Sequence, residues 1–126
     1  MSNQDCILRG AKVLIVEDEP FIALDIAYGV EQAGGVALGP ATTVAEALRL
    51  IETERPDGAI VDVDLPDGTI EPVLKVLRPG VPVIVHTGVG LPDALQGTYP
   101  DLEVFRKPTP PAALASRLFP SGEGSS

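Results

Sequence analysis

The sequence predicts a three-layer α/β fold built on a parallel sheet of five strands. Five short apolar runs, rich in valine and isoleucine, alternate along the chain with segments of helical periodicity. Strands that are apolar on both faces are typical of parallel sheets, in which right-handed crossovers place helices on either side. A length of 126 residues suits one domain.

The first expected strand covers residues 12–16 and is followed by acidic residues and a proline. Proline is favoured in the first turn of a helix and paired glycines end one, so we expect a helix from Pro20 to about Ala33. Its apolar residues recur at helical spacing, which predicts that they face the core. These residues are Phe21, Leu24, Ala27, Tyr28 and Val30.

A short second strand is expected over residues 36–39, closed by Pro40. The next helix begins at Thr43, which forms a capping box with Glu46, and it ends near residue 54. The third strand, residues 59–61, leads directly into Asp62, and the Asp67-Gly68 pair that follows is interpreted as a turn.

The second half of the chain continues the alternation, with a short helix over residues 70–77 and strands over 81–86 and 102–106. Residues 91–99 show a weak helical pattern, and Thr109 is expected to cap a final helix that runs to about Phe119. The domain thus covers residues 12–119, after a lead-in of residues 1–11. The tail, residues 120–126, has too little apolar surface to order itself and is expected to be mobile.

Composition limits the classes of function. The net charge is −9 and lysine and arginine form no cluster, which argues against a nucleic acid as direct partner. No apolar run approaches the roughly 20 residues of a membrane helix, and the first residues lack the features of a signal peptide. A single cysteine suits a reducing cytosol. We therefore expect a cytoplasmic protein without membrane contact, either a monomer or a weak homodimer, that binds other proteins.

Polar side chains follow the expected strands where each strand ends. Functional residues of parallel α/β sheets gather outside the carboxyl ends of the strands, so these side chains are expected to meet. They are Glu17 and Asp18 after the first strand, Asp62 after the third, Thr87 at the end of the fourth, and Lys107 after the fifth.

Three clustered carboxylates repel one another, since two unit charges about 4 Å apart interact by roughly 4 kcal/mol at an effective dielectric constant of 20. Mg²⁺ prefers oxygen ligands, so Glu17, Asp18 and Asp62 with one backbone carbonyl are a suitable ligand set. An aspartate beside a bound cation can attack a phosphoryl group and become an acyl phosphate. Lys107 then supplies a cation, and Thr87 a hydroxyl, for the added charge.

With these residues in this order, the chain resembles the receiver domain of a bacterial two-component response regulator from about Lys12 to Phe119. The resemblance implies a flavodoxin-like, CheY-like (βα)5 fold with strand order 2-1-3-4-5. It also implies a role for each site residue. Asp62 is the phosphoacceptor, Glu17 and Asp18 are the acidic pair, and the backbone carbonyl of Asp64 completes the Mg²⁺ ligands. Thr87 corresponds to the family's hydroxyl residue, and Lys107-Pro108 to its Lys-Pro dipeptide with a cis bond.

The resemblance further implies a phosphorylatable signalling module that catalyses only its own phosphorylation and dephosphorylation. The phosphoryl group would come from a sensor histidine kinase or a histidine phosphotransfer protein. Because the sequence ends after the fifth helix, we expect it to act through a downstream protein partner or as a phosphate sink. Phosphorylation is expected to draw Thr87 towards the phosphate and to change the surface of the fourth helix, fifth strand and fifth helix.

Some positions depart from the receiver pattern. The acidic pair is Glu-Asp where Asp-Asp is commoner, and Val104 occupies the place of the switch aromatic. Phe105 stands one residue later, so the switch candidates are Thr87 and Phe105, with core packing as the alternative for Phe105. His86 must face away from Thr87 and is interpreted as a packed residue with satisfied hydrogen bonds. Residues 82–88 are similar to the Pro-Phe-x-Phe-Ala-Thr-Gly signature of a subgroup of stand-alone receivers. They agree with it at Pro82, Thr87 and Gly88.

Two other classes of function were compared with the receiver. A haloacid-dehalogenase-like, Mg²⁺-dependent phosphatase would use Asp62 and Asp64 as nucleophile and acid/base. In that superfamily, however, the Asp-x-Asp strand comes first and further acids follow the lysine. A degenerate receiver-like binding module would lack part of the five-residue set that is complete here. Two roles are considered for the Asp64 side chain. It is either solvated, or it orients the water that hydrolyses the acyl phosphate.

Overall fold

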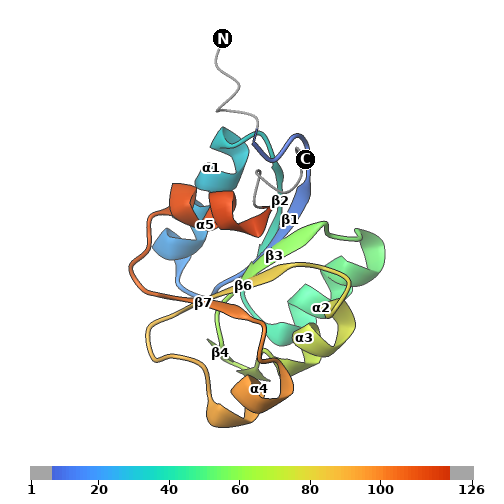
Figure 1. Cartoon of the computed structure of the whole chain (residues 1–126). Coiled ribbons are helices and arrows are strands. Elements are labelled where there is room, and N and C mark those ends of the chain that lie inside the picture. The colour runs from blue at the N-terminus through green and yellow to red at the C-terminus, as the bar shows by residue number, and fades with distance from the viewer. Residues whose placement is uncertain (1–6, 120–126) are drawn as a thin grey trace.

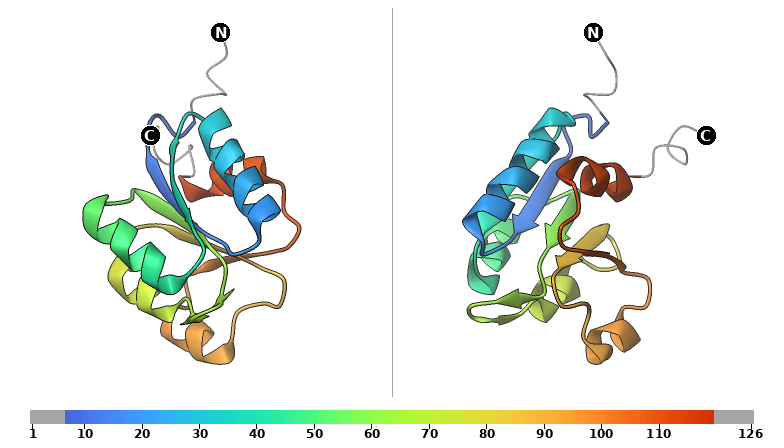
Figure 2. Two further views of the ribbon diagram at one scale, coloured as in Figure 1. Left: turned by 180° about the vertical axis from the view of Figure 1, so that it is seen from behind. Right: turned by 90° about the vertical axis from the view of Figure 1, so that its left-hand side faces the viewer.

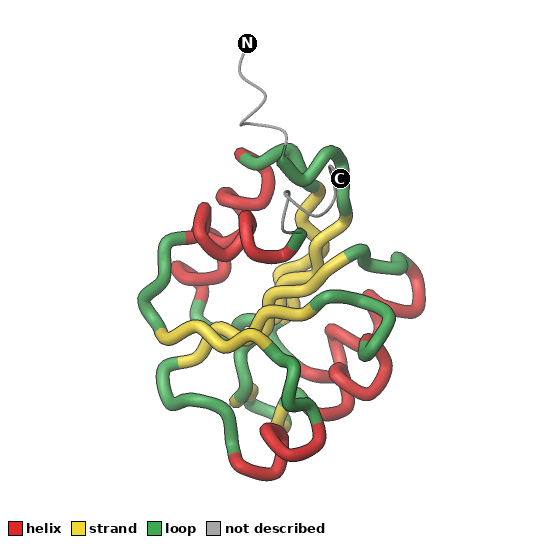
Figure 3. The backbone as a smooth tube through the Cα atoms, in the orientation of Figure 1, coloured by secondary structure: helices red, strands yellow, loops and turns green. Residues whose placement is uncertain are grey.

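A computed structural model describes residues 7–119 of the chain. Five strands form one parallel sheet in the order β2-β1-β3-β6-β7 (Figures 1 and 3). They are β1 (Lys12–Val16), β2 (Val36–Ala41), β3 (Gly58–Val61), β6 (Val83–Thr87) and β7 (Glu103–Arg106). Numbered among themselves, these strands have the predicted order 2-1-3-4-5. The prediction of a flavodoxin-like α/β fold is therefore confirmed.

Helices cover both faces of the sheet, as the apolar character of its strands requires. Helices α1 (Pro20–Gln32) and α5 (Pro111–Leu118) lie together on one face, whereas α2 (Val44–Thr53), α3 (Glu71–Leu77) and α4 (Asp93–Thr98) lie on the other (Figure 2). Each face has its own apolar core. The α1–α5 core is centred on Ile15, Ile26, Val30, Ile60, Ile84 and Leu114, and the α2–α3 core on Val16, Ala47, Val61, Leu74 and Val85.

The predicted core face of α1 is wrong for three of its five residues. Phe21, Leu24 and Tyr28 are 84%, 60% and 64% exposed, whereas Ala23, Ile26 and Val30 are buried. Helix α1 has two apolar stripes at the same period, and periodicity alone does not say which one meets the sheet. The stripe of Ala23, Ile26 and Val30 lies inside, and α5 packs closely against the same helix at Gly29, where an added Cβ would lie 2.5 Å from the Cβ of Pro111.

Pro40 does not close β2, contrary to the prediction. The strand runs to Ala41 through a cis Gly39-Pro40 bond, and Gly39 has a φ of +96°, a conformation that favours glycine. Pairing with β1 shifts register between Leu14 and Val16. A proline is tolerated here because β2 is an edge strand, so the missing N–H interrupts no second ladder.

A two-stranded hairpin that the sequence did not predict follows Asp62, formed by β4 (Asp64–Leu65) and β5 (Gly68–Thr69). The expected cap by Thr109 is also absent, because its hydroxyl donates to the carbonyl of Arg106 at 2.6 Å while Pro110 precedes α5 without a side-chain cap. The tail expected to be mobile lies outside the described residues. No helix within residues 7–119 has the length and apolar character needed to span a bilayer.

Candidate functional site

The backbone positions the candidate site at the carboxyl ends of the strands. Parallel pairing continues just beyond the strands, since Asp62 N–H donates to the Val16 carbonyl and Lys107 N–H donates to the Thr87 carbonyl, both at 2.9 Å. Glu17 N–H likewise donates to Ala41. The register of the sheet thus brings the Cα atoms of residues 17, 62, 87 and 107 to one edge.

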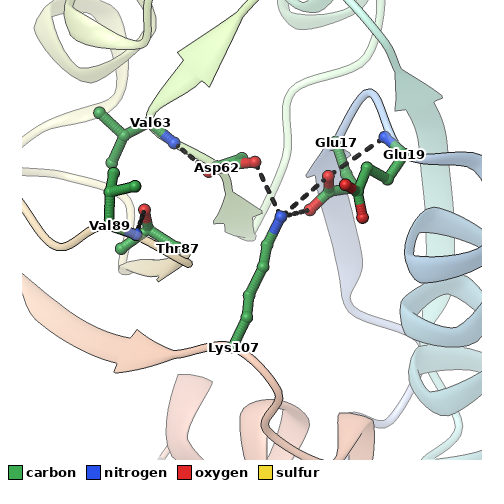
Figure 4. Close-up of polar contacts among 7 residues, drawn as sticks. All are labelled: Glu17, Glu19, Asp62, Val63, Thr87, Val89 and Lys107. Carbon is green, nitrogen blue, oxygen red and sulfur yellow. Dashed lines mark hydrogen bonds and ion pairs between the residues drawn. The ribbon is translucent and has the colours of Figure 1, made fainter.

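Lys107 joins the carboxylates at this edge (Figure 4). Its Nζ lies 2.9 Å from Asp62 Oδ2, 3.2 Å from Glu17 Oε2 and 3.1 Å from Glu17 Oε1. Among the described residues, Glu17 Oε1 is buried without a hydrogen bond, so its contact with Lys107 is an ion pair that lacks hydrogen-bond geometry. The Glu17 side chain is only 1% exposed, which makes this a carboxylate removed from water.

The electrostatics of the three groups follow from this burial. Burial raises the pKa of Glu17 above its ordinary value, and the hydrogen bonds from Lys107 and from Glu19 N–H offset only part of that effect. Burial alone would lower the pKa of Lys107, but its hydrogen bonds to Asp62 and Glu17 outweigh burial and raise it. Lys107 therefore stays charged, whereas Glu17 carries a charge that the protein stabilises incompletely.

The donor set fits a hard divalent cation. Glu17, Asp18 and Asp62 each offer a carboxylate oxygen, and these oxygens lie within 4.8 Å of one another. The unbonded buried oxygen of Glu17 is the group that a cation would satisfy. Asp64 follows two residues after Asp62 at the start of β4, and its exposed side chain lies outside this cluster.

Thr87 lies on the far side of Asp62 from Glu17 (Figure 4). It is 1% exposed, and its hydroxyl accepts a hydrogen bond from Val89 N–H at 3.2 Å. Asp62 Oδ1 accepts from Val63 N–H at 2.7 Å, which orients the carboxylate. The Lys107-Pro108 bond is cis, as the resemblance implied.

Two neighbours of the site face the α1–α5 core. Phe105 is partly buried and packs there, which fits the alternative of core packing. His86 is buried as expected, but among the described residues neither of its ring nitrogens has a hydrogen-bond partner, so the expectation of satisfied hydrogen bonds is wrong. It borders a cavity of about 110 Å³ that Asp25 and Lys107 also line. Burial, and then the charge of Lys107, lowers the pKa of His86 and favours the neutral imidazole.

Sequence reasoning missed the contact that Asp67 makes with a distant helix. Its carboxylate accepts hydrogen bonds from Val44 N–H at 2.8 Å and Ala45 N–H at 3.0 Å, at the start of α2. A Pro-Asp-Gly sequence indicates a turn in any context, so nothing in it points to a helix that begins 23 residues earlier.

No family model matches the chain. A curated relative, the phyllosphere-induced regulator PhyR of Methylorubrum extorquens, is 32% identical over 114 residues, which are 86% of this chain and 38% of the relative. The transcriptional regulatory protein PdtaR of Mycobacterium tuberculosis is 33% identical over 88 residues, 68% of this chain and 42% of that protein. The chain thus spans less than half the length of these relatives.

Solved structures agree with these sequence relatives. The response regulator PhyR of Brucella abortus has a TM-score of 0.74 and 32% identity, covering 98% of this chain and 53% of that one. A CheY-like response regulator receiver domain from Methanospirillum hungatei has a TM-score of 0.79 and 26% identity, covering 91% and 95%. The chain is homologous to response-regulator receiver domains. In this receiver domain, the edge that holds Asp62 and Lys107 is the edge where the resemblance placed the phosphorylation site.

Proposed function

We propose that this receiver domain accepts a phosphoryl group on Asp62, with Mg²⁺ bound by Glu17, Asp18, Asp62 and the backbone carbonyl of Asp64. The observation that carries the proposal is the bridge by Lys107 Nζ between Asp62 and the buried Glu17, beside a third carboxylate. Signalling through phosphorylation is the activity that receiver homology supports. The cytoplasm is the compartment we propose, because cytosolic kinase domains would supply the phosphoryl group there.

The proposed reaction is phosphoryl transfer from a phosphohistidine. A carboxylate oxygen of Asp62 attacks phosphorus, a P–O bond forms, the P–N bond to the donor imidazole breaks, and the imidazole nitrogen keeps the electron pair and takes up a proton. Lys107, 2.9 Å from Asp62, neutralises charge on the transferred group. Bound Mg²⁺ would stabilise the same negative charge. Thr87 would donate its hydroxyl to a phosphoryl oxygen, changing the contact that it now makes with Val89.

The exposed residues of α1 are the surface on which we propose that the histidine donor docks. Phe21, Leu24 and Tyr28 form this α1 surface, and they follow the acidic residues of the site along the chain. The only charged residues of α1 are acidic, Asp25 and Glu31. A donor with an apolar helix face flanked by lysine or arginine therefore fits, and it would bring its phosphohistidine to the edge where α1 begins.

The proposal is tested by incubating the protein with acetyl phosphate and Mg²⁺ and measuring its intact mass. The wild type is expected to gain one phosphoryl group, and Asp62→Asn none, because the amide is not a nucleophile. Asp64→Asn is the matched control and should still be phosphorylated. An adduct that persists in Asp62→Asn, or one that Asp64→Asn abolishes while it still binds Mg²⁺, contradicts the assignment.

Donor docking predicts a difference between protein and small-molecule donors. In Phe21→Ser, transfer from a phosphorylated histidine kinase is expected to slow about tenfold or more, since large aromatic anchors dominate interface energetics. Phosphorylation by phosphoramidate should be unchanged, because that donor needs no docking surface. Val76→Ser, on the exposed side of α3, is the control and should react normally with both. Equal rates of kinase transfer in the two variants would exclude the α1 surface as the docking site.

No feature of residues 7–119 favours the phosphatase alternative. Its acid/base would be the side chain of Asp64, which is exposed and outside the carboxylate cluster. We propose that the phosphorylated protein acts on a downstream protein partner or serves as a phosphate sink. Its proposed oligomeric state is a monomer or weak homodimer.

A further inference from the structure

The loop between Asp62 and α3 is held at its tip by a contact to another part of the fold. Its hairpin pairs Asp64 with Thr69 and Leu65 with Gly68, and Asp67 lies at the tip. The Asp67 carboxylate accepts from Val44 N–H with Oδ1 and from Ala45 N–H with Oδ2. Both carboxylate oxygens are therefore committed to the first turn of α2.

The base of the hairpin is anchored separately. Ile70 N–H donates to the Val63 carbonyl at 3.0 Å, and Leu65 is 8% exposed and packs in the α2–α3 core. Asp64 lies between these two anchors, next to Leu65 on the strand that leads to the tip, and its own side chain is exposed. Because β4 connects the base of the hairpin to its tip, a shift of the tip tilts the Asp64–Leu65 peptide, which carries the Asp64 carbonyl.

Helix α2 already has a cap of its own. Thr43 Oγ1 accepts from Glu46 N–H at 3.0 Å, and Glu46 Oε1 accepts from Thr42 N–H at 2.8 Å. The predicted cap by Thr43 is confirmed, whereas Glu46 accepts from Thr42 N–H instead of the Thr43 N–H that a capping box requires. Asp67 adds a second attachment at the same helix end, and this one ties α2 to the loop after the candidate phosphoacceptor.

We infer that Asp67 is a positioning residue, which holds the Asp64 carbonyl in place for Mg²⁺ by fixing the hairpin tip to the first turn of α2. The inference rests on the proposed function, in which that carbonyl is a metal ligand. Outer residues that orient metal ligands affect affinity without touching the ion. The two backbone hydrogen bonds also lower the pKa of Asp67, so the carboxylate keeps its charge, and the contact persists, throughout the neutral range.

The test is isothermal titration of Mg²⁺ into the full chain, combined with urea unfolding. Asp67→Ala is expected to raise the dissociation constant about tenfold. Thr43→Ala removes a cap from the same helix end but leaves the loop untouched, so it should lower stability and leave Mg²⁺ affinity unchanged. Asp67→Asn keeps one acceptor oxygen and should recover part of the affinity; it also serves as the second variant where Asp67→Ala is poorly folded.

Equal Mg²⁺ affinity in the wild type and the Asp67 variants overturns the inference and leaves the proposed function intact. The same loss of affinity in Thr43→Ala and Asp67→Ala also overturns it, because Asp67 would then act only through the stability of α2. Absence of Mg²⁺ binding in the wild type contradicts the metal site of the proposed function, and this inference falls with it.

Discussion

Replacing Lys107 with methionine is expected to lower the free energy of unfolding by about 3 kcal/mol without divalent cations, since removing one partner of a buried ion pair leaves an uncompensated charge. Lys107 neutralises two carboxylates, Glu17 and Asp62, whose side chains are only 1% and 11% exposed. The raised pKa of Lys107 means that its stabilisation is fully present below its ordinary pKa of 10.5 and is lost only as pH rises through the higher folded-state value.

Urea unfolding at neutral pH, with and without Mg²⁺, measures this effect. Mg²⁺ should raise the midpoint more in Lys107→Met than in the wild type, because the cation replaces the missing charge. Adding Glu17→Gln to Lys107→Met should recover part of the loss, since the buried carboxylate is then gone.

Lys12→Met is the control, because Lys12 pairs with Glu54 where both side chains are 46% exposed and such pairs contribute about 1 kcal/mol or less. An equal loss in Lys12→Met and Lys107→Met would contradict the role of Lys107 as the countercharge of this site.

The second large effect is expected at Gly29, within α1. Gly29→Ala would bring a methyl group to 2.5 Å from the Cβ of Pro111, on a ring that cannot rotate away. Overpacking of this kind costs about 1–3 kcal/mol, against a gain of about 1 kcal/mol in helix propensity. We expect a net loss of stability of up to about 2 kcal/mol, because α5 must move away from α1.

Gly97→Ala in α4 is the matched control for Gly29→Ala, since no atom in the described part of the chain lies within 4 Å of the position of its Cβ. Only the higher helix propensity of alanine acts at this position, so the free energy of unfolding is expected to rise by about 0.5–1 kcal/mol. Urea unfolding of the two variants checks both values. A gain of stability in Gly29→Ala would contradict this prediction, because α5 would then accommodate the methyl group without loss of packing energy.

Much of the fold was predictable because its determinants are local. Residues 13–16 and 58–61 are apolar in every position except the glycine, and both runs are fully buried in the sheet. The site followed from the same pattern and one rule of topology: in a parallel sheet, the residues after each strand lie at a common edge. Asp62 and Lys107 are 45 positions apart in sequence, yet each could be located from the end of its own strand.

Which of two similar stripes of a helix is buried was decided only by the tertiary structure. Helix α1 offers Phe21, Leu24 and Tyr28 on one side and Ala23, Ile26 and Val30 on another, with nearly the same spacing. The larger residues would gain more from burial. In the structure the smaller stripe is buried instead, and Pro111 packs close to Gly29 on the same helix. That choice leaves the larger side chains exposed on the α1 surface.

Contacts between distant loops were likewise beyond the sequence. The bonds that Asp67 accepts from Val44 and Ala45 depend on how far the hairpin reaches, and the lack of a partner for the His86 nitrogens within residues 7–119 depends on which groups surround the ring. Apolar periodicity and strand ends are properties of short segments, so the sequence alone determined the layers, the strand order and the residues that meet at the site. Helix faces and side-chain partners depend on the relative placement of segments, and the tertiary structure decided them.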